Sequence, residues 1–530
     1  MKFNKKYNIG LLALGMLLVT GCTKDFEAIN TNPTAYTQSS FDPNYTLTTA
    51  QLGYTGSTDF AYDTWRGNLI YSSTMIQGFS TVLGYWAGDK YLLNEGYLAA
   101  YWGTPAVGAY VEQVKPIVDL VEFTRTDPKY SNLYQAARIW KALVFARLTD
   151  LYGDVPYKDA GKGFYTGNYA PKYDKQQDIY TDLLKEVDEA SAALVVGGNK
   201  ITGDAIFQGD IAKWKTFGNS IMLRLAMRLT KVDENLAKTY LTKAVGKTMT
   251  SNADNAFLVH DVSGARVTQN RNSQILLGDG GQETYYVKWS DTFINLLKSK
   301  TDPRLGKVAV LALYANDGTK TQNTNFITTP ALQKGMPNGK DLSGIAGRDV
   351  RQDASFTTFN DYSGPHPAMT RRTGPTLIMT YAETELLWAE AAQRYAVGGS
   401  AATHYNNGVK AAMTYLGTYD ASLAVSGADA DIYLLANPYV AVTGLQQINT
   451  QYWLHTNTML DFYESWSNWR RSGFPVLTPV VYPNNATSGT IPRRFVYPVE
   501  EKANDAVNYN EAVSRLTGGD KLTSRVWWDK

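Results

Sequence analysis

The chain has 530 residues, a formal net charge of +2 at pH 7 and a single cysteine. Its near-neutral charge gives no basic field of the kind that attracts nucleic acid. One cysteine excludes a disulfide within the chain, so the core depends on packing alone, which this length allows. The length would suit roughly two to four domains, yet no Pro/Gly/Ser-rich linker and no block of charge divides the sequence.

The first 21 residues have the layout of a bacterial export signal: lysines, an apolar run over residues 9–19, and small residues before the cysteine. The run is shorter than the roughly 20 apolar residues of a spanning helix. It ends in VTGC, which resembles a lipobox, the signal for acylating a cysteine and cleaving just before it. We therefore expect removal of residues 1–21 and acyl chains such as palmitate on Cys22, enough to hold the protein on a membrane. The alternative is an ordinary secreted protein with an incidental cysteine.

Residues 22–60 are predicted to form the lipidated N-terminus and a tether, because they are rich in Thr, Ser, Asn and Pro. The sequence KDFE at residues 24–27 resembles the Lys-acidic signal that sends lipoproteins of the Bacteroidetes to the outer face of the outer membrane. Loss of residues 1–21 removes three lysines and no acid, which leaves a formal charge of −1. A cell-surface location with no nucleic-acid partner is expected.

Helical periodicity appears in two blocks, at about residues 131–250 and 376–470. In the first helix of the first block, one stripe ends just before Gly153, a good terminator. The residues of this stripe are Leu133, Ala136, Ala137, Trp140, Val144 and Leu148. Paired amphipathic helices with small residues at their crossings suggest tetratricopeptide-like hairpins. Between the blocks, residues 250–375 are rich in turn signals and short strands. We therefore predict a mainly α protein in which residues 61–530 form one domain.

Five segments along this domain resemble a known family. They are, in order, GDIAKWKTFGNSIMLRLAMRLT, KSKTDPRL, MTYAETELLWAEAAQR, ESWSNWRRSGFPVL and IPRRFVYPVEEKANDAVNYNEA. With the lipobox, they are similar to the SusD/RagB family of nutrient-binding outer-membrane lipoproteins, over nearly the whole chain. The resemblance implies a helical scaffold with a variable, loop-rich ligand face, which sits as a lid on a SusC-like, TonB-dependent β-barrel transporter. It also implies binding without catalysis. Oligosaccharide is the expected ligand, and oligopeptide is the alternative.

Candidate ligand residues are rings and acids in loops, because a sugar site needs flat apolar faces beside hydrogen-bonding groups. The strongest candidate is Trp86 in GYWAGD, where glycines flank two adjacent rings and an acid follows. By their positions in the implied ligand face, several further residues are candidates. The full set is Asp63, Trp65, Tyr85, Trp86, Asp89, Trp102, Tyr285 and Arg372. The competing interpretation is that Trp102 covers a helix end and that Tyr285 lies in the core.

Two further groups of charged residues allow either a functional role or a structural role as buried ion pairs. Glu383 and Glu390 lie about two helical turns apart, and a pair of acids is also what a surface glycoside hydrolase would use; interhelical ion pairs are favoured. The doublets Arg470-Arg471 and Arg493-Arg494 suit either ligand carboxylates or buried partners, and structural roles are favoured. Four scattered histidines without paired spacing predict no metal site. No nucleotide or nucleophile motif is present, so no cofactor is expected.

Overall fold

The computed structural model describes residues 41–58, 60–278, 282–315 and 322–530. The predicted signal peptide, Cys22 and most of the predicted tether lie outside these residues. Asn44–Lys530 forms one compact unit. Within the described residues, every helix is too short or too polar to cross a membrane.

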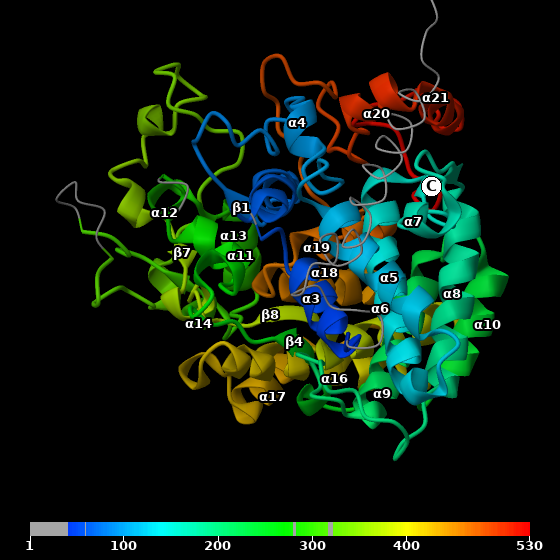
Figure 1. Cartoon of the computed structure of the whole chain (residues 1–530). Coiled ribbons are helices and arrows are strands. Elements are labelled where there is room, and N and C mark those ends of the chain that lie inside the picture. Colours follow the sequence, from blue (N-terminus) through cyan, green and yellow to red (C-terminus); the bar gives the residue numbers. More distant parts are fainter. Residues whose placement is uncertain (1–40, 59, 279–281, 316–321) are drawn as a thin grey trace, which may run out of the picture. The chain divides into compact units, whose positions relative to one another are not determined.

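The first helical block supplies the helices at the right of Figure 1, in cyan and green. Each helix packs against the next along the chain. These helices are α5 (Lys115–Thr124), α6 (Ser131–Tyr152), α8 (Gln176–Ala193), α9 (Ile211–Arg228) and α10 (Glu234–Ala244). The predicted stripe of α6 is buried along its whole length. The helix ends at Gly153, whose φ of 89° favours glycine and whose N–H donates to Thr149 O.

The second block begins at α15, and its first residues explain why a helix starts there. Thr380 and Glu383 form a capping box, in which each side chain accepts a backbone N–H of the other residue. The helix α15 packs against α16, α18 and α9, so it joins the two blocks. The block comprises α15 (Tyr381–Tyr395), α16 (Ala401–Thr414), α17 (Gly427–Ala436), α18 (Gly444–Thr458) and α19 (Phe462–Ser472). The prediction of a mainly α protein with helical hairpins is confirmed.

Shorter elements surround these blocks. The remaining helices are α3 (Asn44–Tyr54), α4 (Glu95–Leu98), α7 (Gly163–Thr166), α11 (Arg271–Leu276), α12 (Glu283–Tyr286), α13 (Asp291–Ser299), α14 (Leu305–Val308), α20 (Val499–Asn504) and α21 (Ala506–Ser514). Two π-helices are η1 (Thr64–Ser73) and η2 (Tyr110–Val114). Single 3-10 turns lie at Pro128–Tyr130, Asn252–Asp254, Ala265–Val267, Pro330–Leu332, Val350–Gln352, Phe359–Asp361, Pro367–Met369, Tyr415–Thr418, Ala421–Leu423 and Ala441–Thr443.

The strands are short and form antiparallel pairs that tie distant loops together. The pairs are β1 (Phe79–Ser80) with β5 (Lys288–Trp289), β2 (Val155–Pro156) with β3 (Tyr173–Asp174), β4 (Ala256–Leu258) with β8 (Thr376–Met379), and β6 (Ala309–Val310) with β7 (Gly364–Pro365). Pairing of β1 with β5 brings the loop that follows β1 close to α12.

The predicted tether extends too far. Residues 44–54 form α3, and Leu47, Ala50 and Tyr54 of this helix lie in the core. The Trp140 Nε1–H of α6 also donates to Ala50 O at 3.3 Å. The sequence of α3 is polar enough to resemble a tether, but Leu47, Ala50 and Tyr54 are each at most 3% exposed. The boundary of the folded unit therefore lies near residue 44, not near residue 60.

Candidate functional site

Four of the predicted ligand residues are structural. Trp86, the strongest candidate, is 0% exposed and belongs to the core, so its ring has no free face for a sugar. Asp89 is equally buried and accepts the Gly339 N–H at 2.8 Å. It also pairs with the buried Lys90 at 3.1 Å. The loop thus turns Trp86 inward, and the prediction for these two residues is wrong.

Asp63 and Trp102 also serve the fold. Asp63 caps η1 and accepts the backbone N–H groups of Ser57 and Thr64 at 2.7 and 2.6 Å. Burial raises the pKa of Asp63. Trp102 is buried among the rings of four tyrosines and stacks on Tyr173 with centroids 5.7 Å apart. Neither side chain offers a surface to a ligand, so both predictions are corrected.

Tyr285 and Arg372 are partly exposed but lie in other surroundings. Tyr285 is in edge contact with the rings of Tyr286 and Phe359 at 5.1 and 5.7 Å. Arg372 donates from Nη1 to Gln269 Oε1 at 2.9 Å. Their predicted contact with ligand stays a prediction.

The remaining two candidates, Trp65 and Tyr85, come together over one carboxylate. The Trp65 Nε1–H donates to Glu283 Oε1 at 2.9 Å, and the Tyr85 hydroxyl donates to the same oxygen at 2.7 Å. Glu283 is 0% exposed, whereas both rings are half-buried. The rings are nearly perpendicular, with centroids 6.3 Å apart. Because their polar atoms point to a buried acceptor, the two rings are fixed in orientation while part of each stays open to solvent.

Three further half-buried rings extend this pair. We call the five rings Phe60, Tyr62, Trp65, Tyr85 and Tyr97 the aromatic cluster. Phe60 lies edge-on to Trp65 at 5.5 Å. Phe60 and Ala61 both have positive φ, near 56° and 51°, a costly conformation that shapes the entry into η1. Gly84, beside Tyr85, has open space around it. The backbone at the start of η1 and in the loop after β1 therefore holds these rings in place.

Arg66 supplies the charge of this site. Its guanidinium lies 3.4 Å from the centre of the Tyr62 ring and 4.6 Å from that of Tyr97. Its Nε is buried and has no hydrogen-bond partner among the described residues. Burial lowers the pKa of Arg66. The Nε is closed off from solvent, so a hydroxyl or carbonyl oxygen of a ligand would reach only the other nitrogens of this half-buried guanidinium.

The sequence offered partial signals for this site. The density of rings between residues 60 and 97 was visible, and Trp65 and Tyr85 were among the candidates. Phe60, Tyr62 and Tyr97 were missed because each looks like a core ring when read alone. Glu283 was missed because it is 218 residues away from Trp65, its hydrogen-bond partner.

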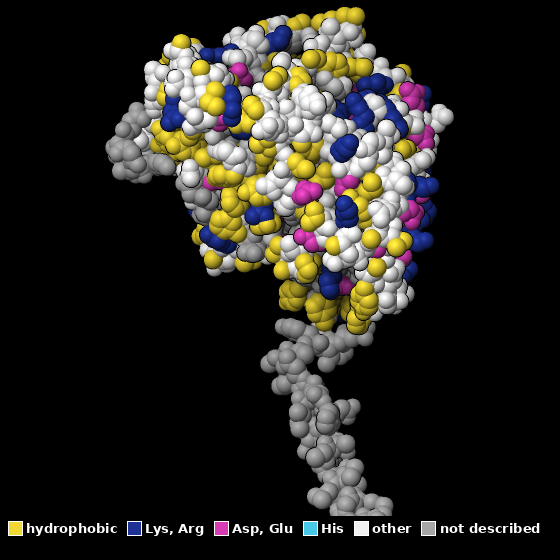
Figure 2. Space-filling view, turned by 90° about the horizontal axis from the view of Figure 1, so that it is seen from above, with side chains coloured by type: hydrophobic (Ala, Val, Ile, Leu, Met, Phe, Trp, Pro, Cys, Tyr) yellow, Lys and Arg dark blue, Asp and Glu magenta, His cyan; other side chains and the backbone are white. Residues whose placement is uncertain are grey.

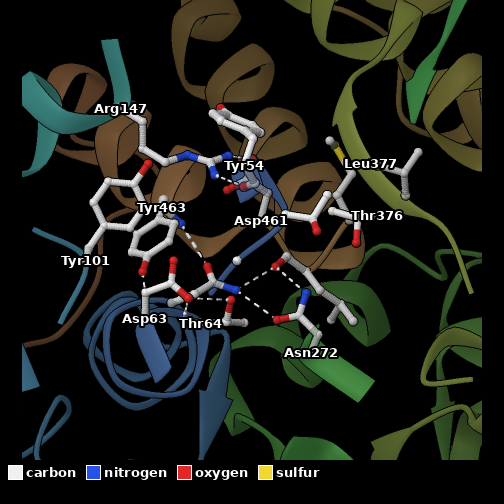
Figure 3. A pocket seen from close by; sticks show the side chains of 15 residues that line it. Tyr54, Asp63, Thr64, Tyr101, Arg147, Asn272, Thr376, Leu377, Asp461 and Tyr463 are labelled. Carbon is white, nitrogen blue, oxygen red and sulfur yellow. Dashed lines mark hydrogen bonds and ion pairs between the residues drawn. The ribbon is translucent and has the colours of Figure 1, made fainter. Parts of the chain in front are cut away.

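Behind the aromatic cluster lies a polar cavity of about 30 Å³, which Figure 3 shows from close by. Asn68 donates to Asn272 Oδ1 at 3.0 Å, and the Tyr463 hydroxyl donates to Asp63 O at 2.9 Å. Arg147 pairs with Asp461 at 3.2 Å. A volume of this size holds a water molecule or two rather than a sugar ring. The cavity is therefore part of the support for η1.

The acids that a glycosidase would need are engaged in ion pairs. Glu390 is 1% exposed and accepts from Arg471 at 2.7 and 2.6 Å. Glu383, 0% exposed, pairs with Arg224 at 2.7 Å. Arg493 and Arg494 pair with Asp529 and Asp520. The structural interpretation of these residues is confirmed. Within the described residues, His, Cys, Asp and Glu nowhere gather in a group of three or more that could hold a metal ion.

Charge is mixed on the molecular surface. Figure 2 shows acidic and basic side chains interspersed over one face, with hydrophobic side chains in several separate areas. This face carries no continuous basic stripe of the kind that binds nucleic acid.

A family model described as "starch-binding associating with outer membrane", SusD-like, matches residues 44–498. This chain belongs to the SusD-like family. A solved structure described as a chitin-binding protein is 34% identical, with a TM-score of 0.79 over 92% of this chain and 100% of that one. A SusD-like structure described as Bacteroidetes AC2a is 27% identical, with a TM-score of 0.78 and the same coverage. A chitin-binding SusD homologue from Flavobacterium johnsoniae is 23% identical, with a TM-score of 0.71 over 92% and 98% of the two chains.

No curated protein matches the chain. The family match begins at the first residue of α3, which agrees with the corrected boundary of the folded unit. The description of this family is that of starch-binding proteins associated with the outer membrane, so carbohydrate binding is its shared property. Its members are binding proteins rather than enzymes.

Proposed function

We propose that this SusD-like protein captures an oligosaccharide at the aromatic cluster. The observation that carries the proposal is the pair Trp65 and Tyr85, both anchored to the buried Glu283, beside the half-buried guanidinium of Arg66. Rings fixed in this way present apolar surface to the C–H faces of a sugar without losing side-chain entropy on binding. Arg66 supplies donors for sugar oxygens. Such a site holds a ligand and performs no bond chemistry.

Chitin fragments are the first ligand to test, because the 34% identical relative is described as chitin-binding. The acetamido carbonyl of N-acetylglucosamine is an acceptor that suits the guanidinium of Arg66. An oligopeptide is the second candidate ligand, since it also carries carbonyl acceptors. A peptide depends less on stacking, so loss of a ring would affect it less.

The captured ligand is delivered, in this proposal, to a SusC-like, TonB-dependent barrel in the outer membrane. The acylated Cys22 anchors the protein at the cell surface, where it acts as a lid over the barrel. Such a partnership would bury an interface of more than roughly 1,000 Å². The family match to proteins associated with the outer membrane supports this arrangement.

Calorimetric titration of chitohexaose into the soluble chain, with and without Trp65→Ala, tests the site. We expect a loss of affinity of at least tenfold, about 1.4 kcal/mol. Tyr45→Ala is the control for loss of a ring outside the aromatic cluster, since Tyr45 is exposed and lies on α3. Equal binding by the wild type and Trp65→Ala would contradict the site assignment. Binding of peptides but not glycans would move the proposal to the second ligand class, and release of new reducing ends would contradict a binding-only role.

A further inference from the structure

Exposed aromatic rings gather at a second place, far along the chain from the aromatic cluster. Among the described residues, only Tyr45, Phe164, Tyr165 and Tyr169 are aromatic and largely exposed. Three of these four lie within six consecutive residues. Phe164 is 88% exposed and Tyr169 is 82% exposed. Exposed apolar groups that gather in this way usually mark a binding surface.

This segment, Gly161–Pro171, which we call the α7 loop, is held by its own hydrogen bonds. Its short helix α7 ends at Gly167, whose φ of 71° lies in the left-handed region. The Tyr169 ring packs on Gly163, where an added Cβ would lie 2.8 Å from the ring. Asn508 of α21 donates to Ala170 O at 3.2 Å and ties the loop to its neighbour. The rings are therefore presented by a preformed loop.

The composition of the region indicates what the rings would contact. Residues 157–172 contain no Val, Leu, Ile or Met, so their large apolar groups are all aromatic. Exposed polar side chains lie beside the rings, among them Lys158, Asn168 and Lys172. Besides rings, protein interfaces favour Met and Arg, which residues 157–172 lack, and disfavour Lys and Ala, which these residues contain. A membrane-binding loop usually adds Leu to its rings. Rings with a polar rim are instead the combination that a carbohydrate needs.

The geometry also limits the form of the carbohydrate. The rings of Phe164 and Tyr165 are 5.4 Å apart and perpendicular, at 88°. They do not share a plane, so they do not match the flat face of a crystal. A single hydrated chain, which can bend from one ring to the next, does match them.

The α7 loop and the aromatic cluster lie on different elements: in Figure 1, α7 is at the right, whereas α4, which carries Tyr97, is in the upper middle. The helix α12, which begins at the Glu283 anchor, lies at the left of the same figure. We propose that the α7 loop is a second carbohydrate-binding surface, which holds a distant part of a soluble polysaccharide while the aromatic cluster holds a short segment of it. This inference rests on the proposed function of the aromatic cluster. Two linked weak contacts raise the affinity for a polymer but not for a short oligomer.

The test compares glycol chitin, a soluble polymer, with chitohexaose. The variant Phe164→Ala/Tyr169→Ala should lose about tenfold in affinity for the polymer through lost avidity, and keep its affinity for chitohexaose. Tyr45→Ala should change neither affinity. Trp65→Ala should lower both. Circular dichroism confirms that each variant is folded, which the exposed positions of Tyr45, Phe164 and Tyr169 favour. It is needed most for Trp65→Ala, because that variant removes a donor from the buried Glu283.

The other possible results of this experiment each contradict one of the two proposals or both. Unchanged binding of the polymer by the double variant would overturn the second surface, while an effect of Trp65→Ala would leave the proposed function standing. An equal loss for polymer and hexasaccharide would also overturn it, because the loop would then act on the main site. If the double variant binds polymer normally but no longer co-purifies with an outer-membrane barrel, the loop is a protein-docking surface. A wild type that binds neither probe contradicts both proposals.

Discussion

One buried carboxylate, that of Glu283, fixes the orientation of two rings in the aromatic cluster. Glu283 accepts from both Trp65 and Tyr85, so it orients two rings that are distant in sequence. Burial, followed by the hydrogen bond to Glu283, raises the pKa of Tyr85, which keeps this hydroxyl a neutral donor. The polar atoms of the pair therefore serve the fold, and the ring surfaces remain for a ligand.

Tyr85→Phe and Tyr85→Ala separate these two roles. The phenylalanine keeps the ring and loses the anchor, so we expect a loss of affinity smaller than tenfold, below about 1.4 kcal/mol. The alanine loses the ring, and its loss should exceed tenfold. Both variants leave Glu283 with one donor fewer and should lower the free energy of unfolding by about 1–3 kcal/mol. Titration calorimetry and urea denaturation measure these effects. Equal loss of affinity in the two variants would mean that the hydroxyl, not the ring, contacts the ligand.

The sequence predicts such a site only in part, for a physical reason. Tyr85 and Trp86 are adjacent, yet one faces solvent and the other the core. Composition favours both rings equally. What separates them is tertiary: Tyr85 meets Glu283, and the loop is held by the contact of Asp89 with Gly339, 250 residues further along the chain. Spacing along a loop carries no information about such partners.

Helices could be predicted from the sequence where the residues that define them lie within the helix itself. The stripe of α6, its glycine terminator and the helical pattern of α15 are all encoded within each helix. The helix α3 was missed because tertiary contacts stabilise its polar sequence. Gln51, for example, is buried and donates to Asp204 Oδ1 at 2.8 Å. The two-residue strands depend in the same way on distant partners.

The contact between α15 and α19 rests on a buried ion pair that can be tested directly. Arg471 binds Glu390 through both carboxylate oxygens, and both residues are 1% exposed. Arg471→Met would leave Glu390 in the core with only the Nε of Arg394 as an ionic partner. We expect the free energy of unfolding to fall by about 3–5 kcal/mol, measured by urea denaturation.

Two companion variants make this result interpretable. Lys115→Ala removes an exposed pair with Asp119 and should change stability by less than about 1 kcal/mol. Arg471→Met/Glu390→Leu removes both charges and should recover much of the loss. A single variant as stable as the wild type would show that the pair does not hold α19 on α15.

At the scale of the whole molecule, buried charge joins both helical blocks. Arg224 of α9 pairs with Glu383 of α15, and Arg228 of α9 pairs with Glu464 of α19. The Tyr452 hydroxyl of α18 lies 2.8 Å from Glu383 and 2.9 Å from Glu464. A hydroxyl has one proton and donates to only one of them at a time. The second carboxyl makes a hydrogen bond to the Tyr452 oxygen only when it is protonated and donates its own O–H. The arrangement therefore favours one extra proton shared by the two carboxyl groups.

Glu383 is the group that holds this proton. Burial raises the pKa of Glu383 to about 7, and the charge of Glu464 adds to the effect, against the opposing charge of Arg224. In contrast, Arg228 and Arg224 keep the pKa of Glu464 below its ordinary value despite burial. A carboxyl with a raised folded-state pKa stabilises the fold fully at pH values below its unfolded pKa. That contribution is lost as the pH rises toward 7.

Glu383→Gln should therefore gain stability relative to the wild type as the pH rises. Between pH 5 and pH 8 the wild type should lose about 2 kcal/mol that the variant does not lose. Urea denaturation of both proteins at several pH values in this window measures the difference, in which the titration of all other groups cancels. Glu390→Gln is the control: Arg471 and Arg394 hold the pKa of Glu390 at about 2 despite burial, so Glu390 is ionised throughout the window and its difference from the wild type should be large and constant. A constant difference for Glu383→Gln as well would show that Glu383 does not change its protonation state, and the shared proton would have to be abandoned.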